Sequence, residues 1–353
     1  MPNGQTPSDR TGPSRPTLRQ VAALSGVSLK TASRVMNGEQ YVAEATAAKV
    51  QAAAAQLGFR RNTIARELRS GARSSSIGLI IGDLANPFYS RIARGAERRL
   101  RADNLQLITA SSDEDPDLEH RLVADMLERR VSAMLIVTSG SDHGYLDAER
   151  RLGTPVAFLD RPPEDIVADT IVLDNVAGVR QAVEHLLGYG HRRIGLVGDL
   201  SRLETHRERI AAFSEAMTTA GIADWQTYVR VDSHDVETSE RAVRDLLALD
   251  PPPTALFTTN NRITIGALRA LRGLADPPAL VGFDDFDLAD LLGVTVIAHD
   301  PERMGELAAD IVLARLGGTT GPARRELLPT TLIARGSGER PPPSWPRDES
   351  PIR

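Results

Sequence analysis

The chain has 353 residues, of which 41% are hydrophobic, a formal net charge of −5 and no cysteine. The length predicts two or three domains, and the lack of cysteine excludes disulfide frameworks and cysteine-based metal or redox chemistry. No apolar run reaches the roughly 18 residues of a membrane helix, and the first residues are polar, so we expect a cytoplasmic protein without membrane contact.

Charge is distributed unevenly along the chain. The stretch 16–70 holds eight basic and three acidic side chains, so the residues that follow it are strongly acidic. A basic segment joined to an acidic body is typical of a module that binds DNA phosphates, attached to a domain that does not.

Residues 17–36, TLRQVAALSGVSLKTASRVM, have the spacing of a helix-turn-helix. Thr17 and Gln20 form a capping-box pattern that starts the first helix at residue 18, and Gly26 suits the tight turn. A helix-turn-helix reads DNA, whereas the alternative is a small helical bundle with a charged surface. Small and apolar residues mark the helix crossing and the buried face of the second helix: Ala22, Val27, Ala32 and Val35.

The second helix would enter the major groove by its N-terminal end. Ser28 is placed to cap it, and Lys30, Thr31 and Arg34 lie where side chains reach base edges. A third helix over 44–57, ended by Gly58, would complete a head of residues 16–60. The head residues that we expect at DNA are Thr17, Ser28, Leu29, Lys30, Thr31, Ser33, Arg34 and Asn37.

A hinge segment, residues 61–75, follows the head. Asn62 can cap a helix and Gly71 can end it, and a helix this short is marginal in water by itself. We expect it to form only with DNA and a second copy of the chain, through Asn62, Ala65 and Leu68. Leu68 either packs on the neighbouring domain or is a wedge inserted between base pairs in the minor groove.

From residue 76, short apolar runs alternate with amphipathic helical patterns. This alternation predicts an α/β fold of parallel strands, long enough for two doubly wound lobes. The expected strands are IGLII, LQLITA, AMLIV, VAFLD, TIVLD, RIGLVG, ALFTT, ALVGF and TVIAHD. The expected helices span about 87–103, 117–130, 175–189, 207–220, 237–249, 261–274 and 301–317.

Polar and aromatic side chains follow several expected strands. The carboxyl ends of parallel strands meet at one edge of a sheet, where ligands of α/β proteins bind. Acids, amides, an arginine and an aromatic face suit a polyol, although each polar residue could instead be a helix cap, as Asp174 and Asn175 could. The effector-binding candidates are Phe88, Tyr89, Thr138, Asp160, Arg161, Arg209, Asn260 and Asp284.

These motifs together resemble the LacI/GalR family of bacterial transcription regulators, over roughly residues 16–335. The resemblance rests on the head, on Asn-x-x-Ala-x-x-Leu in the hinge, and on the runs NPF at 86–88, GHRRI at 190–194 and GFDD at 282–285. It implies the two-lobed fold of periplasmic sugar-binding proteins over 76–335, with crossings near 161–173, 285–300 and 318–325. The implied N-lobe spans 76–161 and 300–318, and the implied C-lobe 173–285 and 325–335. The resemblance also assigns effector contact to Phe88, Thr138, Asp160, Arg209, Asn260 and Asp284.

The sequence departs from the family pattern at four places. Arg61 stands where the hinge has proline, and Ala43 cannot cap the third helix. Asn261 replaces the aspartate beside the pocket, and residues 233–235 lack the aromatic side chain that stacks on a sugar ring. The last two departures concern the identity of the ligand.

No enzyme signature and no metal-ligand spacing competes with this interpretation, and no cofactor is expected. His191 is interpreted as structural. The ends, 1–15 and 336–353, are rich in proline, glycine and charge and are expected to be disordered. No C-terminal heptad repeat is present, so we expect a dimer rather than a tetramer.

The sequence thus predicts a homodimeric repressor that is released from a palindromic double-stranded operator by a small-molecule effector, a sugar. A corepressor mode with a purine or nucleoside is the alternative within the family. A solute-binding protein is a remote alternative, against which the basic head argues, and an enzyme of sugar metabolism is more remote still.

Overall fold

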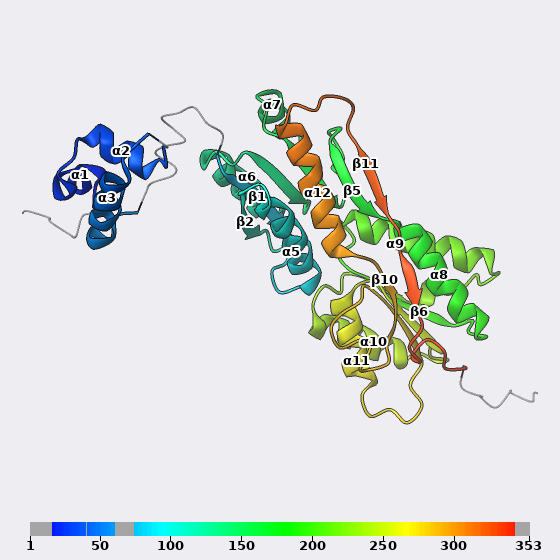
Figure 1. Ribbon diagram of the computed structural model, residues 1–353. Helices are drawn as coiled ribbons and strands as arrows, with labels where there is room; N and C mark the ends of the chain where they lie inside the picture. Colours follow the sequence, from blue (N-terminus) through cyan, green and yellow to red (C-terminus); the bar gives the residue numbers. More distant parts are fainter. Residues whose placement is uncertain (1–15, 40, 61–73, 343–353) are drawn as a thin grey trace, which may run out of the picture. The chain divides into compact units, whose positions relative to one another are not determined.

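The structure, a computed structural model, describes residues 16–39, 41–60 and 74–342. The chain divides into two compact units between residues 73 and 74 (Figure 1). The hinge candidates Asn62, Ala65 and Leu68 lie outside the described residues, as do the ends 1–15 and 343–353.

The first unit contains the three predicted helices: α1 (Leu18–Ser25), α2 (Leu29–Met36) and α3 (Glu44–Leu57). Thr17 and Gln20 form the capping box, and Gly26 takes the left-handed φ of 68° that the turn requires. Ala43 makes no side-chain cap, so α3 begins without one. Val21, Ala32 and Val50 are fully buried between the helices and fix the crossing of α1 and α2.

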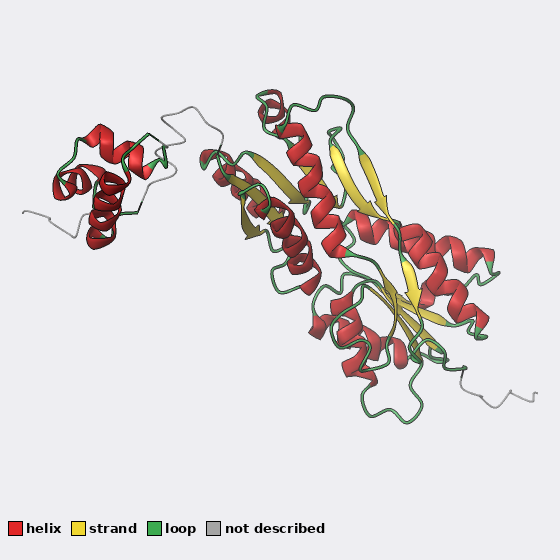
Figure 2. Cartoon of the chain, viewed as in Figure 1, coloured by secondary structure: helices red, strands yellow, loops and turns green. Residues whose placement is uncertain are grey.

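The second unit consists of two six-stranded sheets, each with helices on both faces (Figure 2). The strand order is β11-β5-β4-β3-β1-β2 in the N-lobe and β12-β10-β9-β8-β6-β7 in the C-lobe. All strand pairs are parallel except β10 with β12. The predicted α/β fold with two doubly wound lobes is confirmed.

The N-lobe sheet contains β1 (Ser76–Ile81), β2 (Gln106–Ser111), β3 (Ala133–Val137), β4 (Val156–Asp160), β5 (Asp169–Leu173) and β11 (Arg325–Leu328). Its helices are α5 (Pro87–Arg101), α6 (Pro116–Glu128), α7 (Leu146–Arg151) and α12 (Pro301–Leu316).

The C-lobe sheet contains β6 (Ile194–Val197), β7 (Val229–Arg230), β8 (Ala255–Thr258), β9 (Ala279–Phe283), β10 (Thr295–Ala298) and β12 (Thr331–Ile333). Its helices are α8 (Asn175–Gly188), α9 (Glu204–Thr219), α10 (Val236–Leu247) and α11 (Asn261–Leu271), with the 3-10 turn η1 (Trp225–Tyr228).

All nine expected strands are present, and α9 is the expected helix whose start differs most, at Glu204 instead of residue 207. Leu203 precedes α9 without a side-chain cap, so the sequence carries no start signal there. The short elements α7, β7, β11 and β12 were not predicted. They lack the long apolar or amphipathic pattern on which the prediction depended.

The predicted crossings between the lobes are wrong in detail. Strand β5 pairs with β4 in the N-lobe sheet, so the first crossing follows residue 173. Strand β11 was assigned to the C-lobe but pairs with β5, from Arg325 opposite Thr170 to Leu328 opposite Leu173. The last crossing therefore lies between β11 and β12, not at 318–325. The carboxylate of Asp169 holds this edge, because it accepts hydrogen bonds from Arg315 and from the Arg324 backbone at 2.8 Å.

The prediction that disorder begins at residue 336 is also wrong for 336–342. Ser337 is buried, and its hydroxyl donates to the Leu280 carbonyl at 2.6 Å. The Glu339 carboxylate accepts from Thr295 Oγ1 at 2.8 Å and lies 2.5 Å from His185 Nε2. Composition alone predicted a solvated tail, but these polar side chains have buried partners on the C-lobe.

No helix in the described part of the chain combines the length and apolarity needed to cross a bilayer.

Candidate DNA-binding head and effector cleft

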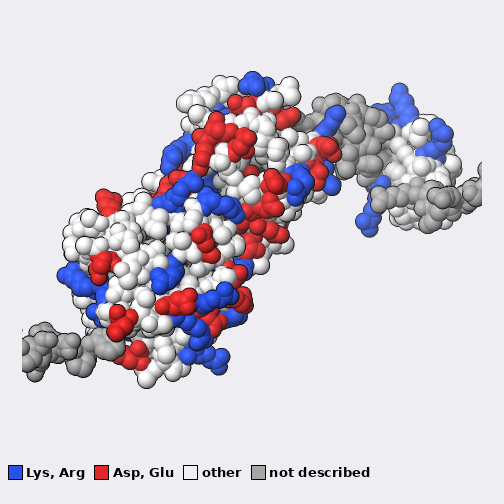
Figure 3. Space-filling model, turned by 180° about the vertical axis from the view of Figure 1, so that it is seen from behind, with Lys and Arg blue, Asp and Glu red and all other residues white. Residues whose placement is uncertain are grey.

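The DNA-binding candidates of the head lie on α2, at its two ends and, for Thr17, directly before α1. Ser28 caps α2, since its hydroxyl accepts from the Thr31 backbone at 3.1 Å. Leu29 and Lys30 are exposed in the first turn of α2, while Thr31, Ser33 and Arg34 are half-buried. This exposed helix start has the geometry that reads a major groove. In the view of Figure 3 the coloured side chains of the head are basic.

Arg34 is held by an acidic neighbour. Its Nε donates to the Glu39 carboxylate at 2.9 Å, and both side chains are exposed by about two fifths. Lys30, by contrast, forms no ion pair within the described residues. Thr17 uses its hydroxyl in the capping box, so its contribution to the head is the start of α1. Asn37 is exposed after the last turn of α2.

The structure brings the effector candidates together between the two lobes, and all eight are buried, with 3–7% exposure. We call this region the cleft. Two aspartates, one from each lobe, define it. Asp160 ends β4 and Asp284 follows β9, and both adopt a left-handed backbone, with φ of 65° and 70°. Left-handed residues other than glycine are strained and concentrate at functional sites.

The two carboxylates have different environments. Burial raises the pKa of Asp160, against the lowering effect of the Arg161 and Arg209 charges, and the charge of Asp284 raises it further. Burial opposes ionisation of Asp284 as well, but a hydrogen bond from His299 and the charge of Arg209 lower its pKa. His299 Nε2 lies 2.8 Å from Asp284 Oδ1. The cleft therefore holds one carboxylate with a lowered pKa, Asp284, and one with a raised pKa, Asp160.

Arg209 and Phe88 lie beside these aspartates. The Arg209 guanidinium lies 3.8 Å from the centre of the Phe283 ring, donates to Asn175 at 2.8 Å and to the Thr259 carbonyl at 2.5 Å. Its Nη2 group makes no hydrogen bond within the described residues. The Phe88 ring meets His299 edge-on at 5.4 Å. Arg209 Nη2 thus supplies two N–H donors to the cleft, and Phe88 supplies an apolar surface.

The remaining candidates form a second polar group. Arg161 pairs with Glu114, with Tyr89 and with the carbonyl of Thr138. Asn260 caps α11 and donates to Asp199 at 2.7 Å. His234 Nδ1 lies 2.8 Å from the other Asp199 oxygen, and this bond raises the pKa of His234.

Sequence reasoning missed Glu114, Asp199, His234 and His299. Glu114 and Asp199 follow strands β2 and β6, so the strand-end argument applies to them as well. Within the run SDEDP, however, Glu114 has the appearance of a solvated loop. Asp174, by contrast, is the helix cap considered as its alternative role, because it accepts from the Ala177 backbone at 3.0 Å.

Direct contacts join the lobes at the cleft. Asn261 donates to Asn86 at 2.9 Å, and Arg262 pairs with Asp83. Arg202 reaches from the C-lobe to the Ser139 carbonyl at 2.7 Å and to the Glu114 carbonyl. Asn261, noted as a departure from the family pattern, thus binds the opposite lobe in this chain.

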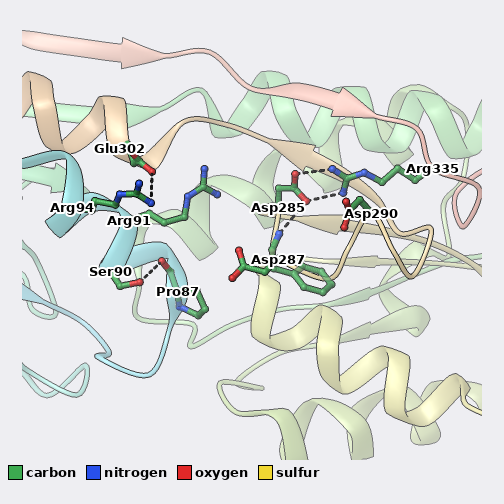
Figure 4. A pocket seen from close by; sticks show the side chains of 10 residues that line it. Pro87, Ser90, Arg91, Arg94, Asp285, Asp287, Asp290, Glu302 and Arg335 are labelled. Carbon is green, nitrogen blue, oxygen red and sulfur yellow. Dashed lines mark hydrogen bonds and ion pairs between the residues drawn. The ribbon is translucent and has the colours of Figure 1, made fainter.

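A separate crevice of about 570 Å³ lies between the start of α5 and the loop after β9 (Figure 4). Its acidic side includes Asp285, which pairs with Arg335 at 2.7 and 2.8 Å. None of the predicted effector residues lines it. Its lining consists of Pro87, Ser90, Arg91, Arg94, Asp285, Phe286, Asp287, Asp290, Glu302 and Arg335.

His191 is structural, as predicted. Its Nδ1 lies 3.0 Å from Thr254 Oγ1 and its Nε2 lies 2.8 Å from the Arg340 carbonyl, so it holds the C-terminal segment. Within the described residues, no three histidine, aspartate or glutamate side chains are grouped as metal ligands.

A helix-turn-helix head together with a two-lobed body and a polar cleft defines a DNA-binding transcription regulator controlled by a ligand. Residues 17–62 match the family of bacterial regulatory proteins, lacI family, and residues 183–338 match a periplasmic binding protein-like domain. The chain belongs to the LacI family. It is a transcription regulator and not an enzyme.

Relatives of known role agree over nearly the whole chain. The HTH-type transcriptional regulator PtxS of Pseudomonas aeruginosa is 34% identical, over 92% of this chain and 96% of that protein. The ribose operon repressor of Escherichia coli (strain K12) is 30% identical, over 91% of this chain and 99% of the repressor.

Solved structures agree as well. The lac repressor dimer bound to operator and the anti-inducer ONPF is 26% identical, with a TM-score of 0.78 over 92% of this chain and 99% of that one. The complex of the regulator CelR with cellobiose is 29% identical, with a TM-score of 0.68 over 92% of this chain and all of that one.

Proposed function

We propose that the protein is a homodimeric cytoplasmic repressor that binds a palindromic operator and is released from it by a sugar. Each head places Lys30, Thr31 and Arg34 in a major groove, and the paired hinges insert Leu68 at the operator centre. The sugar binds the cleft and changes the position of one lobe relative to the other. That change prevents the hinge helices from pairing, and operator binding in turn weakens sugar binding.

The pair of carboxylates in the cleft carries the proposal of a sugar. Asp160 and Asp284 come from opposite lobes, and carboxylates accept hydrogen bonds from the hydroxyl groups of a polyol. Arg209 adds donors and Phe88 an apolar surface beside them. Related regulators have been solved with cellobiose and with ribose bound, which supports the same class.

Dimerisation follows from the operator. One helix-turn-helix reads only a half-site, and a two-fold protein matches a palindrome. The loop after β9 exposes three leucines, Leu288, Leu291 and Leu292, by 56–80%. This loop is the surface that we propose for contact with the second copy, because an exposed apolar cluster of this kind marks a protein interface.

The test is operator binding by the full-length protein, measured by fluorescence anisotropy with and without a panel of sugars and nucleosides. Release by a neutral sugar supports the proposal, whereas tighter binding with a purine establishes the corepressor mode. The matched variant is D284N, because asparagine keeps the shape and tolerates the left-handed backbone. D284N should bind operator normally and need at least about tenfold more sugar for release.

The wedge role of Leu68 has its own test. L68A should lower specific operator affinity and leave sugar binding unchanged, because its side chain would no longer separate the base pairs. Unchanged operator affinity in titration would show that Leu68 packs on the protein instead.

A further inference from the structure

Arg161 is a buried arginine whose two Nη groups already donate to protein acceptors. Nη1 donates to Glu114 Oε2 at 2.6 Å and to the Thr138 carbonyl at 2.7 Å. Nη2 donates to Glu114 Oε1 and to the Tyr89 hydroxyl, both at 2.9 Å. Each Nη group has two N–H donors, so both groups are fully used. The Nε donor has no hydrogen-bond partner within the described residues and lies 3.5 Å from the Asp160 carboxylate.

The chain makes room for Glu114 in the cleft. Its backbone takes a left-handed φ of 57°, which turns the loop after β2 back toward β1, and its N–H donates to the Gly82 carbonyl at 3.0 Å. A Cβ atom at Gly82 would lie 2.0 Å from Glu114 Oε1 and 2.8 Å from the Tyr89 hydroxyl. Position 82 therefore needs glycine if Glu114 is to reach Arg161. Glu114 itself is 2% exposed, so this ion pair is an internal part of the cleft.

A buried arginine with a free guanidinium would favour an anionic ligand over a neutral sugar. The planar guanidinium fork matches carboxylate and phosphate groups bidentately, and Glu114 occupies that fork. The other cleft arginine, Arg209, interacts with both Asp160 and Asp284. Beside Arg161, an anionic ligand would thus meet two aspartates and a guanidinium whose Nη donors are all used by the protein.

We propose that Glu114 is the specificity-determining residue of the cleft: by occupying the fork of Arg161, it selects uncharged sugars and excludes sugar phosphates and sugar acids. Glu114 acts through Arg161 and is a positioning residue. This inference rests on the proposed function, in which the cleft binds a sugar.

The first measurement uses matched ligand pairs on the full-length protein: D-ribose with ribose 5-phosphate, D-fructose with fructose 1-phosphate, and D-glucose with gluconate. Isothermal titration of the wild type should show every bound pair favouring the neutral member by at least about tenfold. In E114Q this preference should shrink or reverse, and in the conservative variant E114D it should largely return. A merely structural role for Glu114 would weaken both members of a pair alike.

The second measurement uses inorganic phosphate as the probe. At about 10 mM phosphate, against chloride of equal ionic strength, E114Q should gain roughly 2 °C or more in melting temperature over the wild type, since a ligand of the native state stabilises it. Phosphate that binds the basic head would raise the melting temperature of the wild type as well, so the wild type is the reference for E114Q. The double variant E114Q/R161Q should lose the gain.

Two results would overturn the inference: a wild type that prefers the charged member of any pair, or an E114Q protein that gains neither anion affinity nor phosphate stabilisation. If no sugar of either kind binds the wild type, the proposed sugar effector fails. The phosphate response of E114Q then still decides whether Glu114 occupies an anion-binding fork. If E114Q does not fold, the wild-type preference among the pairs decides alone.

Discussion

The guanidinium of Arg262 on α11 pairs with the carboxylate of Asp83, which follows β1 in the other lobe. Both side chains are about four fifths buried, and the effector candidates between the lobes are buried as well. The pair thus belongs to an arrangement in which the lobes are closed on the cleft, and it stabilises that closed arrangement.

Replacing Asp83 with asparagine should weaken closure. A ligand that binds the closed arrangement must then shift a less favourable equilibrium, so its apparent affinity falls. Loss of a partly buried ion pair of about 1 kcal/mol predicts roughly fivefold weaker sugar binding for D83N. Isothermal titration checks this, and E240Q is the control, because Glu240 pairs with Arg244 within α10 only. Equal effects of D83N and E240Q would contradict a role for the contact between lobes.

In the head, Glu39 competes with DNA for the guanidinium of Arg34. The carboxylate that holds Arg34 must release it before Arg34 can reach a base, and it also repels DNA phosphates. E39Q should therefore bind operator about two- to fivefold more tightly at moderate salt, as exposed ion pairs contribute less than about 1 kcal/mol.

The control for E39Q is E44Q, which changes the head by the same charge. Glu44 lies in the first turn of α3 and forms no ion pair with Arg34. Anisotropy titrations at several salt concentrations separate the two variants. If both raise affinity equally, the effect is net charge alone and the Arg34 contact is irrelevant.

Helices α5 and α12 cross where two glycines allow the backbones to touch. A Cβ atom at Gly305 would lie 2.0 Å from the Ile92 carbonyl oxygen, and one at Gly95 would lie 2.0 Å from the Glu302 carbonyl oxygen. Alanine normally stabilises a helix interior relative to glycine by about 1 kcal/mol. G305A should instead lower the stability of the body by about 1–3 kcal/mol, because the helices must separate.

Thermal unfolding followed by circular dichroism measures this effect. G188A is the matched control, since Gly188 ends α8 and a Cβ atom there would meet no atom within 4 Å. G188A should leave the melting temperature unchanged or raise it slightly. A G305A protein as stable as G188A would show that the crossing adjusts without cost.

Elements with strong local patterns could be predicted from the sequence. The buried strands of the two sheets are apolar runs such as AMLIV, all of whose residues are buried in β3. Edge strand β11, Arg325–Leu328, exposes three of its four residues and has no apolar run to recognise. The sheet that β11 joins depends on where the preceding helix, α12, ends in space, and residues 325–328 do not encode that position. The prediction of the last crossing failed for this reason.

The cleft could be predicted by position but not by pairing. Eight residues near strand ends or, for Phe88, Tyr89 and Arg209, on a helix were expected together, and the structure brings them together. Their partners depend on backbone turns that have no sequence signal, such as the left-handed φ of Glu114. Arg161 was predicted to contact a ligand, yet its guanidinium binds the carboxylate of Glu114, which lies 47 residues earlier in the chain.

His234 makes the stability of the folded state depend on pH. Its hydrogen bond with Asp199 raises its pKa above the ordinary value of 6.5, so protonated His234 stabilises the folded state. This stability is fully present below about pH 6.5 and is lost as pH rises through the raised pKa. H234Q should therefore melt below the wild type at pH 5.5, and the difference should shrink by pH 8.5. Because His234 is about one third exposed, added salt should reduce it.

The comparison with H234Q isolates this one group. Burial lowers the pKa of His191 and His206, so both oppose folding at acid pH, but they do so equally in wild type and variant. D199N removes the partner of His234, so the step from D199N to D199N/H234Q should show no such pH dependence. A difference between wild type and H234Q that grows from pH 5.5 to pH 8.5 would reverse the sign and exclude the ion pair as its source.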